Sequence, residues 1–299
     1  MSENKINLQS AITTLPYLDW NATSSATLDA VAELESGKVL YFPHLAFNLT
    51  DAEKTLLTPE LVDPKRKNIS YQPEQQKLTG VALEAKRETV HKLMARHYQA
   101  CQHLIDSVLP EYRHAVQMPT NSLRLHPIAA WTASTSWRKD DSRLHVDAFP
   151  SRPNYGNRIL RIFTNINPHG ESRQWRVGEP FPQLAQRFLP RLKRYSPFAS
   201  WLLDKVGITK TRRSHYDHLM LQMHDAMKAD KDYQESGPQQ AVEFPPGSSW
   251  ICFSDQTPHA AMAGQYMLEQ TFILPVSAMK TPQHAPLNVL QELLHKPLI

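Results

Sequence analysis

Two stretches decide the fold: RLHVDAF at residues 143–149, and PPGSSWICFSDQTPHAAMAG at residues 245–264. The first reads as a strand, and on a strand His145 and Asp147, two positions apart, lie on the same face. The second supplies a turn, a strand and then His259 just beyond it. In a jelly roll, the end of a late strand can return beside an early hairpin, so His259 can join the other two side chains. Two histidines and one carboxylate leave three coordination positions open, which is the ligand set that favours non-haem Fe(II).

The histidine and aspartate pair is weak evidence when taken alone. The chain has 14 histidines, so a pairing by chance is easy. The alternative is that His145 is a hydrogen-bonded core histidine and Asp147 a turn residue. The later turn, strand and histidine shift the balance toward a metal site, because they give the third ligand a suitable local structure.

Periodicity assigns the other elements. An apolar stripe at helical spacing predicts a long helix over about 81–109, ended by Pro110. A second helical stretch is expected over about 181–230, where methionines form a core-facing stripe. The Thr50 and Glu53 spacing is that of a capping box, which would start a short helix. Short apolar runs bounded by turn residues predict strands over 38–45, 122–131, 143–149, 159–167, 241–244, 249–253 and 266–276.

The order of these elements indicates the fold class. A helix-rich start is followed by strands, a helical insert and strands again. We therefore expect a mainly β protein with a double-stranded β-helix core, a jelly roll of the cupin-like kind, supported by an N-terminal helical layer. The expected organisation is one domain over 1–299, with support from 1–120, a jelly-roll core from 121–170 and 238–280, and a basic helical insert from 171–237.

Composition excludes several classes of protein. The chain has 299 residues, of which 41% are apolar, enough for a sizeable core, and it has no internal repeat. No apolar run approaches the roughly 20 residues that span a bilayer, and the first ten residues are too polar for a signal peptide, so a cytoplasmic location is expected. Cys101 and Cys252 stand far apart without a CxxC partner, so we expect two buried free thiols.

The net charge of +4 is unevenly distributed. The segment 173–213 holds ten Lys or Arg against two acidic residues. Such a segment is either a solvated helical face or a surface for anions: nucleic acid, an anionic membrane surface or an acidic substrate. Aromatic residues do not alternate with the cations and no nucleic-acid motif is present, so nucleic acid is the least favoured.

The residues around the metal motif carry a family resemblance. His145, Asp147 and His259, followed by a strand-like run at 266–276, resemble the HxD…H pattern of Fe(II)/2-oxoglutarate-dependent dioxygenases. The run HVDAFPSRPNYGNRILRIFTNINPHGESRQWRVGEPF at 145–181, together with GKVLYFPHLAF near the start, is similar to the bacterial Kdo hydroxylases, which act on the 3-deoxy sugar of the lipopolysaccharide inner core. The resemblance implies a reaction that consumes O2 and 2-oxoglutarate, releases CO2 and succinate, and hydroxylates C3 of the sugar.

The chain departs from the superfamily pattern at the cosubstrate. Many members hold 2-oxoglutarate with an arginine about ten residues after the last histidine, but this chain has Glu269 and Gln270 there. Some relatives place a cation on the strand after HxD, where this chain offers Arg158 and Arg161. Residues three apart on a strand face opposite sides, so we expect Arg161 to face inward and bind the carboxylate, with Arg158 as a surface charge. Gln270 is expected either to add a hydrogen bond to the cosubstrate or to be an ordinary core residue.

The acceptor implied by the resemblance is an anionic glycolipid, Kdo-lipid A. Arg173 and Arg176 follow the 159–167 strand closely and are expected to reach the sugar, with Arg152 as a third candidate. The other cations of the insert would face the inner membrane surface, with the protein peripheral on it. Two alternatives remain open: a JmjC-like protein hydroxylase, and a cupin-like module that binds a sugar acid without turnover.

Overall fold

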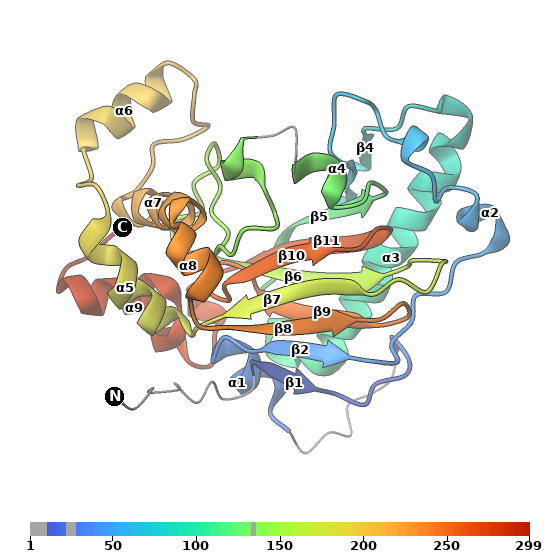
Figure 1. Cartoon of the computed structure of the whole chain (residues 1–299), viewed down its shortest axis with the longest axis horizontal. Helices are drawn as coiled ribbons and strands as arrows, with labels where there is room; N and C mark the ends of the chain where they lie inside the picture. Colours follow the sequence, from blue (N-terminus) through green and yellow to red (C-terminus); the bar gives the residue numbers. More distant parts are fainter. Residues whose placement is uncertain (1–10, 22–27, 133–135) are drawn as a thin grey trace.

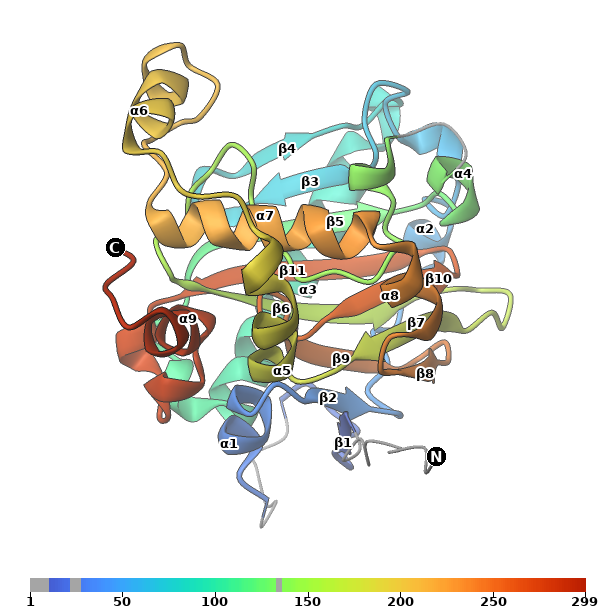
Figure 2. The same cartoon turned by 60° about the vertical axis from the view of Figure 1, so that its left-hand side comes forward.

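The computed structural model describes residues 11–21, 28–132 and 136–299, the side chains of 131 and 132 excepted. Its centre is a pair of β-sheets that lie one over the other, as Figures 1 and 2 show. Within the described residues the larger sheet has the strand order β1-β2-β9-β6-β11-β5-β3-β4, and the smaller has the order β10-β7-β8. This is the expected jelly roll, with helices around it.

The larger sheet is mostly antiparallel. Its middle strands, β6 and β11, pair over their whole length and bring Arg161 opposite Thr271. Directly opposite residues share one face of a sheet, so this register decides which side chains enter the space between the sheets. The strands are β1 (Ile12–Thr14), β2 (Val39–Phe42), β3 (Ile69–Gln72), β4 (Lys77–Thr79), β5 (Gln117–Arg124), β6 (Arg158–Asn165), β9 (Ser249–Phe253) and β11 (Met267–Leu274).

The smaller sheet covers one end of the larger. It consists of β7 (Arg173–Gly178), β8 (Gln239–Phe244) and β10 (His259–Ala263). Aromatic side chains fill the interior at this end: the Trp250 ring stacks on Phe244 with centroids 4.0 Å apart and lies 5.4 Å from Trp175. These contacts fix the smaller sheet against the larger one.

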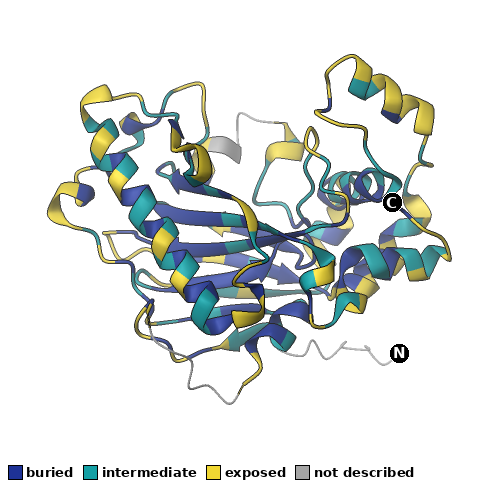
Figure 3. Cartoon of the chain, turned by 180° about the vertical axis from the view of Figure 1, so that it is seen from behind, coloured by how far each residue is buried: buried dark blue, intermediate teal, exposed yellow. Residues whose placement is uncertain are grey.

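A long helix, α3 (Arg87–Val108), packs against the outer face of the larger sheet, and Figure 3 shows it from that side. Every residue of the predicted apolar stripe is buried there, from Val90 to Val108. The predicted capping box also forms at Thr50 and Glu53, at the start of a short helix. This short helix is α2 (Asp51–Lys54). The N-terminal layer also contains α1 (Ala30–Glu35), and α4 (Ala129–Thr132) follows β5.

The helical insert lies beside the smaller sheet and packs on the C-terminal helix α9 (Pro286–Leu294). The predicted methionine stripe is confirmed as core, because Met220, Met223 and Met227 are buried. The helices of the insert are α5 (Phe181–Phe188), α6 (Pro197–Lys205), α7 (His215–Ala229) and α8 (Lys231–Ser236). No helix among the described residues is both long and apolar enough to span a bilayer.

Three of the predictions about the elements are wrong: the start of the insert, the strand over 143–149 and the end of the strand that begins at residue 122. Residues 173–178 form strand β7 of the core, so the insert begins after this strand and not at residue 171. The stretch 143–149 is not a strand; it makes a single bridge, between His145 and His259. The strand predicted over 122–131 ends at Arg124, because the chain turns there before α4.

Candidate active site

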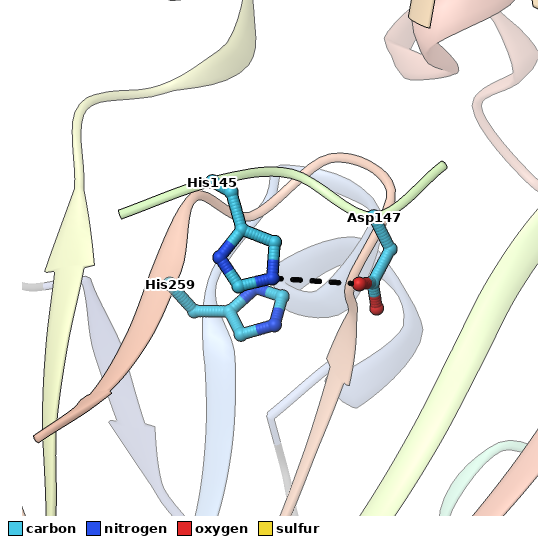
Figure 4. Close-up of side chains that lie close together, drawn as sticks. All are labelled: His145, Asp147 and His259. Carbon is cyan, nitrogen blue, oxygen red and sulfur yellow. Dashed lines mark ion pairs between the residues drawn. The ribbon is translucent and has the colours of Figure 1, made fainter. Parts of the chain in front are cut away.

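His145, Asp147 and His259 come together between the two sheets. Their ligand atoms all lie within 4.8 Å of one another, and in the described part of the chain this is the one cluster of three such groups. Figure 4 shows His145 and Asp147 on one segment and His259 at the start of β10, with the side chains directed to a common space. His145 Nε2 lies 3.7 Å from Asp147 Oδ1.

Backbone hydrogen bonds hold the two segments in register. The amide of His145 donates to the carbonyl of His259 over 3.0 Å, and the reverse bond is 2.9 Å. The amide of Asp147 donates to the carbonyl of Ser254 over 2.8 Å. The three side chains therefore sit on a bonded framework even though 143–149 is irregular.

The imidazoles are oriented for metal binding. Nδ1 of His145 lies 2.7 Å from the Arg143 carbonyl, and Nδ1 of His259 lies 2.9 Å from the Thr257 carbonyl. Because a carbonyl only accepts, Nδ1 carries the proton in both rings and Nε2 keeps its lone pair. Burial lowers the pKa of His145 to about 3 and also lowers that of His259, so both rings are neutral at physiological pH, as metal ligands must be.

Asp147 is held ionised by its surroundings. Burial alone would raise its pKa, but the positive charge of Arg161 outweighs burial and holds the pKa well below its ordinary value. Arg161 Nη2 lies 3.0 Å from Asp147 Oδ2. A neutral His pair and an ionised carboxylate form a donor set suited to a divalent cation with positions left open.

The triad borders a cavity of about 190 Å³. Its walls carry mainly charged and aromatic side chains: Lys67, Asn68, Arg124, Asp141, His145, Asp147, Arg161, Phe163, Arg173, Trp175, His259, Ala261, Met267 and Glu269. Nε of Arg161, Nε of Arg173 and Nε1 of Trp175 are buried donors without a hydrogen-bond partner. Unpaired buried donors are uncommon, so this wall is suited to an anionic ligand.

Arg161 faces this cavity, as expected for the cosubstrate arginine. Its guanidinium also lies 3.2 Å from Glu269, whose second partner is Arg124 at 2.8 Å. Burial would lower the pKa of Arg161, but the charges of Asp147 and Glu269 outweigh it and raise the pKa. Arg161 therefore stays charged in the interior.

Arg158 is not the surface charge that was expected. Its side chain is fully buried, its Nε donates to Asp255 over 2.8 Å, and its guanidinium lies 3.9 Å from the ring centroid of Phe253. The opposite orientation of Arg158 and Arg161 is as expected, but the side away from the cavity is core and not solvent.

Gln270 does not reach the cavity. It lies opposite Ile162 on the face of β11 that packs toward α3, and its Oε1 accepts from Asn121 over 3.0 Å. Of the two alternatives for Gln270, the core residue is the one that the structure has. Its neighbour Glu269 occupies the cavity wall instead.

The three arginines expected to bind the acceptor lie in three different places. Arg173 lines the cavity, with burial lowering its pKa to about 10. Arg176, on the other face of β7, is engaged by protein oxygens, including Ser142 O and Gln234 O. Arg152 borders a separate cleft with Lys77 and Lys210. Arg176 and Arg152 are thus not part of the candidate site.

Sequence reasoning missed Trp175, Glu269 and Arg124. Trp175 stacks on His259 with centroids 5.2 Å apart and supplies one of the unpaired donors. The available signal was the alternation of Arg173 and Trp175, which places both on one face of a strand. His224 on α7 also meets the triad, with its ring edge toward His145 at 5.3 Å between centroids.

A jelly roll that encloses two histidines and one aspartate defines the class of jelly-roll proteins with a facial metal site. A family model described as 3-deoxy-D-manno-oct-2-ulosonic acid (Kdo) hydroxylase matches residues 18–297. The chain therefore belongs to the Kdo hydroxylase family.

Solved structures agree with this assignment. The Kdo hydroxylase KdoO, a non-haem Fe(II) alphaketoglutarate-dependent dioxygenase, in complex with alphaketoglutarate and Fe(III), is 42% identical; the match covers 96% of this chain and 97% of that one, with a TM-score of 0.91. KdoO in complex with cobalt(II) is also 42% identical, covers 97% of each chain and has a TM-score of 0.93. KdoO with succinate and Fe(III) matches at 42% identity, covering 97% of each chain, with a TM-score of 0.91. No curated protein sequence matches the chain.

Proposed function

We propose that this chain is an Fe(II)- and 2-oxoglutarate-dependent dioxygenase that hydroxylates C3 of a Kdo sugar on a lipid A precursor. The observation that carries the proposal is one cavity lined both by the metal-ligand triad and by Arg161, Arg173 and Trp175, whose side chains carry buried donors without a hydrogen-bond partner. Membership of the family and the ligands of its 42% identical relatives support the same cosubstrates.

Fe(II) would be held by His145 Nε2, His259 Nε2 and the Asp147 carboxylate. The carbonyls that accept from each Nδ1 fix the ring orientation and increase the basicity of Nε2. Arg161 keeps the Asp147 carboxylate ionised and limits its rotation. Three protein ligands would leave coordination positions open for the cosubstrate and for O2.

2-Oxoglutarate carries two carboxylates, and the cavity wall fits it. Arg161 and Arg173 offer positive charge and unpaired Nε donors, and Trp175 offers a neutral one. A guanidinium clamps a carboxylate bidentately and retains its charge when buried. Glu269 partly neutralises Arg124 and Arg161, so the cavity wall does not carry several uncompensated cations.

The chemistry requires a dry and ordered cavity. When bound, Fe(II), 2-oxoglutarate and O2 supply the oxidant: one oxygen atom enters the sugar C–H bond to give C–OH, and the other enters succinate as CO2 leaves. The chain contributes orientation and exclusion of water, since Trp175, Phe163 and Met267 form the apolar part of the wall. Arg161 and Arg173 would hold the carboxylates of succinate by the same charges that would hold those of 2-oxoglutarate.

The acceptor would approach where the cavity meets a smaller neighbouring one. That neighbour is lined in part by Lys67, Arg124, Lys139 and Arg173, with Asp141 as the acidic member. A sugar acid on a phosphorylated lipid is anionic, so these cations would orient it toward the triad. A lipid-linked acceptor also places the protein on the inner membrane surface, on its cytoplasmic side.

The test combines purified protein, Fe(II), 2-oxoglutarate and air with a Kdo-bearing lipid A precursor. We expect succinate and a glycolipid heavier by one oxygen atom in the mass spectrum, both absent with Asp147→Asn. Succinate that depends on a protein acceptor and not on the glycolipid would indicate a JmjC-like hydroxylase and refute the proposal. Metal binding without any acceptor-dependent succinate would indicate a binding module.

A further inference from the structure

Helix α6 carries apolar side chains on the outside of the molecule. It projects from the body, beyond the other helices of the insert (Figures 1 and 2). Five large apolar residues of this segment are 43–70% exposed: Phe198, Trp201, Leu202, Val206 and Ile208. The other exposed large apolar residues in the described ranges are scattered along the chain. We call residues 197–208 the α6 tip.

The base of this projection is fixed by hydrogen bonds. Tyr195 Oη donates to the Arg213 carbonyl over 2.8 Å, and Ser200 Oγ donates to the same carbonyl over 2.7 Å. The Tyr195 ring stacks on His215 with centroids 5.0 Å apart. These contacts hold the α6 tip in a defined position, with its apolar side chains away from the core.

Cations surround the tip. The segment 193–213 contains six Lys or Arg and one acidic residue, Asp204. Five of the cations are exposed and, within the described residues, form no ion pair: Lys193, Arg194, Lys205, Lys210 and Arg212. Aromatic and aliphatic side chains ringed by Lys and Arg are typical of segments that lie in an anionic bilayer surface.

We propose that the α6 tip inserts into the headgroup and acyl boundary of a phospholipid bilayer, with the surrounding cations on anionic headgroups. The inference rests on the proposed function in one respect: a lipid-linked acceptor lies in such a membrane. A second copy of the chain is a poorer occupant. A stable dimer needs about 20–30 residues on each side, whereas the tip from Phe198 to Ile208 is a short segment about one small helix long.

The residues that follow the α6 tip contact the loop 150–155, which lies close in sequence to the metal ligands His145 and Asp147. Lys210 N donates to the Ser151 carbonyl over 2.9 Å, and Tyr155 Oη lies 2.8 Å from two acceptors, Thr211 Oγ1 and the Arg212 carbonyl. The loop 150–155 begins three residues after Asp147. Insertion of the tip would thus fix the orientation of the candidate site relative to the membrane plane.

The experiment measures partition of the full, Fe(II)-loaded chain onto vesicles of phosphatidylethanolamine and phosphatidylglycerol that contain no Kdo lipid. We expect Phe198→Ser with Trp201→Ser to weaken partition by about tenfold or more, because apolar burial is lost. Leu18→Ser with Leu83→Ser, at exposed leucines elsewhere, is the matched control and should leave partition unchanged. Lipids brominated in the acyl chains should quench the tryptophan fluorescence of the unmodified chain, and Trp201→Phe should remove most of that quenching.

Three results would overturn the inference. The first is unchanged vesicle partition of the Phe198→Ser/Trp201→Ser variant. The second is fluorescence quenching that persists in Trp201→Phe. The third is a dimer in lipid-free sedimentation that Phe198→Ser with Trp201→Ser dissociates.

A second assay separates this inference from the proposed function. On a water-soluble, deacylated Kdo acceptor, the Phe198→Ser/Trp201→Ser variant should hydroxylate at the same rate as the unmodified chain. On a vesicle-embedded acceptor, its rate should be lower. If the chain hydroxylates neither acceptor, the proposed function is wrong and vesicle partition alone decides the inference.

Discussion

Arg158 and Arg161 lie three residues apart on β6 and have different tasks. Arg161 shares the cavity with Asp147, while Arg158 points to the opposite face and pairs with Asp255. Both guanidiniums are largely out of water, where an unpaired charge would be costly. Each is stabilised by a carboxylate, but only the Arg161 side chain also lines a ligand-sized cavity and has a donor without a hydrogen-bond partner.

The metal ligands can be tested one at a time. His145→Ala or His259→Ala should reduce Fe(II) or Co(II) affinity by about 100-fold or more, since even changes to groups that only orient a ligand cost about 10- to 100-fold. Calorimetric titration under nitrogen measures this, and circular dichroism should show an unchanged fold. His169→Ala, at an exposed histidine, is the control. Near-normal metal affinity in either ligand variant would contradict the assignment.

Arg161 should determine cosubstrate affinity. Replacing it by Gln removes the charged partner of one 2-oxoglutarate carboxylate, worth about 1.5–3 kcal/mol, or roughly 10- to 100-fold in the dissociation constant. Binding to the metal-loaded protein is the measurement. Arg152→Gln, outside the cavity, should change nothing. Equal effects of the two substitutions would show that the cosubstrate lies elsewhere.

At the scale of elements, Arg158 supports the turn between β9 and β10. Asp255 accepts from Arg158 Nε and from the Ile159 amide, and Gln256 accepts from Arg158 Nη2 over 2.6 Å. Arg158→Ala should therefore lower the free energy of unfolding by about 3–5 kcal/mol, because it leaves Asp255 buried and unpaired. Denaturant titration measures the loss. Arg191→Ala, which breaks an exposed pair with Asp230, should cost at most about 1 kcal/mol. Similar losses would contradict this role for the buried pair.

The contact between α3 and the larger sheet should give the protein a pH-dependent stability. Burial, with a smaller effect from the charge of Arg96, lowers the pKa of His97 from 6.5 to about 3. Between pH 6.5 and about 3, His97 is therefore protonated in the unfolded chain but neutral in the folded chain. The free energy of unfolding has its full value above pH 6.5 and falls as the pH decreases toward 3, by at most about 1.4 kcal/mol per pH unit. His97→Gln should flatten this slope in urea titrations at several pH values. An unchanged slope would mean that His97 titrates normally in the fold.

Much of this architecture could be predicted from the sequence where side chains follow a regular period. The α3 stripe matches burial residue for residue, and the methionines of α7 are core as expected. The triad was predicted correctly as a cluster, although its first segment is a loop and not a strand. It could be found because the jelly roll returns β10 to the 143–149 segment, a property of the fold and not of local strand geometry.

The errors have physical causes too. Strand β7 escaped prediction because Arg173 and Trp175 line a polar cavity, so the strand lacks apolar alternation. For Gln270, the alternative of a cosubstrate contact is one residue out of phase: a shift of one along a strand exchanges its two faces, and the pairing of Thr271 with Arg161 puts Glu269 in the cavity. The sequence does not contain that register, since it is set by pairing with a distant strand.

Across the whole molecule, positive charge is concentrated in two places, although the net charge is only +4: around the smaller neighbouring cavity lined by Lys67, Arg124, Lys139 and Arg173, and around α6. Arg191, Arg187 and Arg176 are occupied by partners within the protein, so they do not add to the free cations of the insert. The exposed cations without ion pairs in the described chain include Lys193 and Arg194. These are the charges through which an anionic acceptor or membrane would be attracted.

Salt should therefore separate acceptor use from cosubstrate turnover. Attraction between exposed charges is screened over about 10 Å at 0.1 M salt, whereas buried contacts such as that of Arg161 with Asp147 are screened much less. Raising salt should slow hydroxylation of a vesicle-embedded acceptor strongly and acceptor-free succinate formation little.

Lys193→Glu with Arg194→Glu should reduce vesicle association while iron and 2-oxoglutarate binding stay intact. Lys54→Glu with Lys92→Glu, on α2 and α3 far from α6 in Figure 1, is the matched reversal and should not have this effect. If salt slows both reactions alike, or the two reversals act equally, the cations around α6 are an ordinary solvated surface.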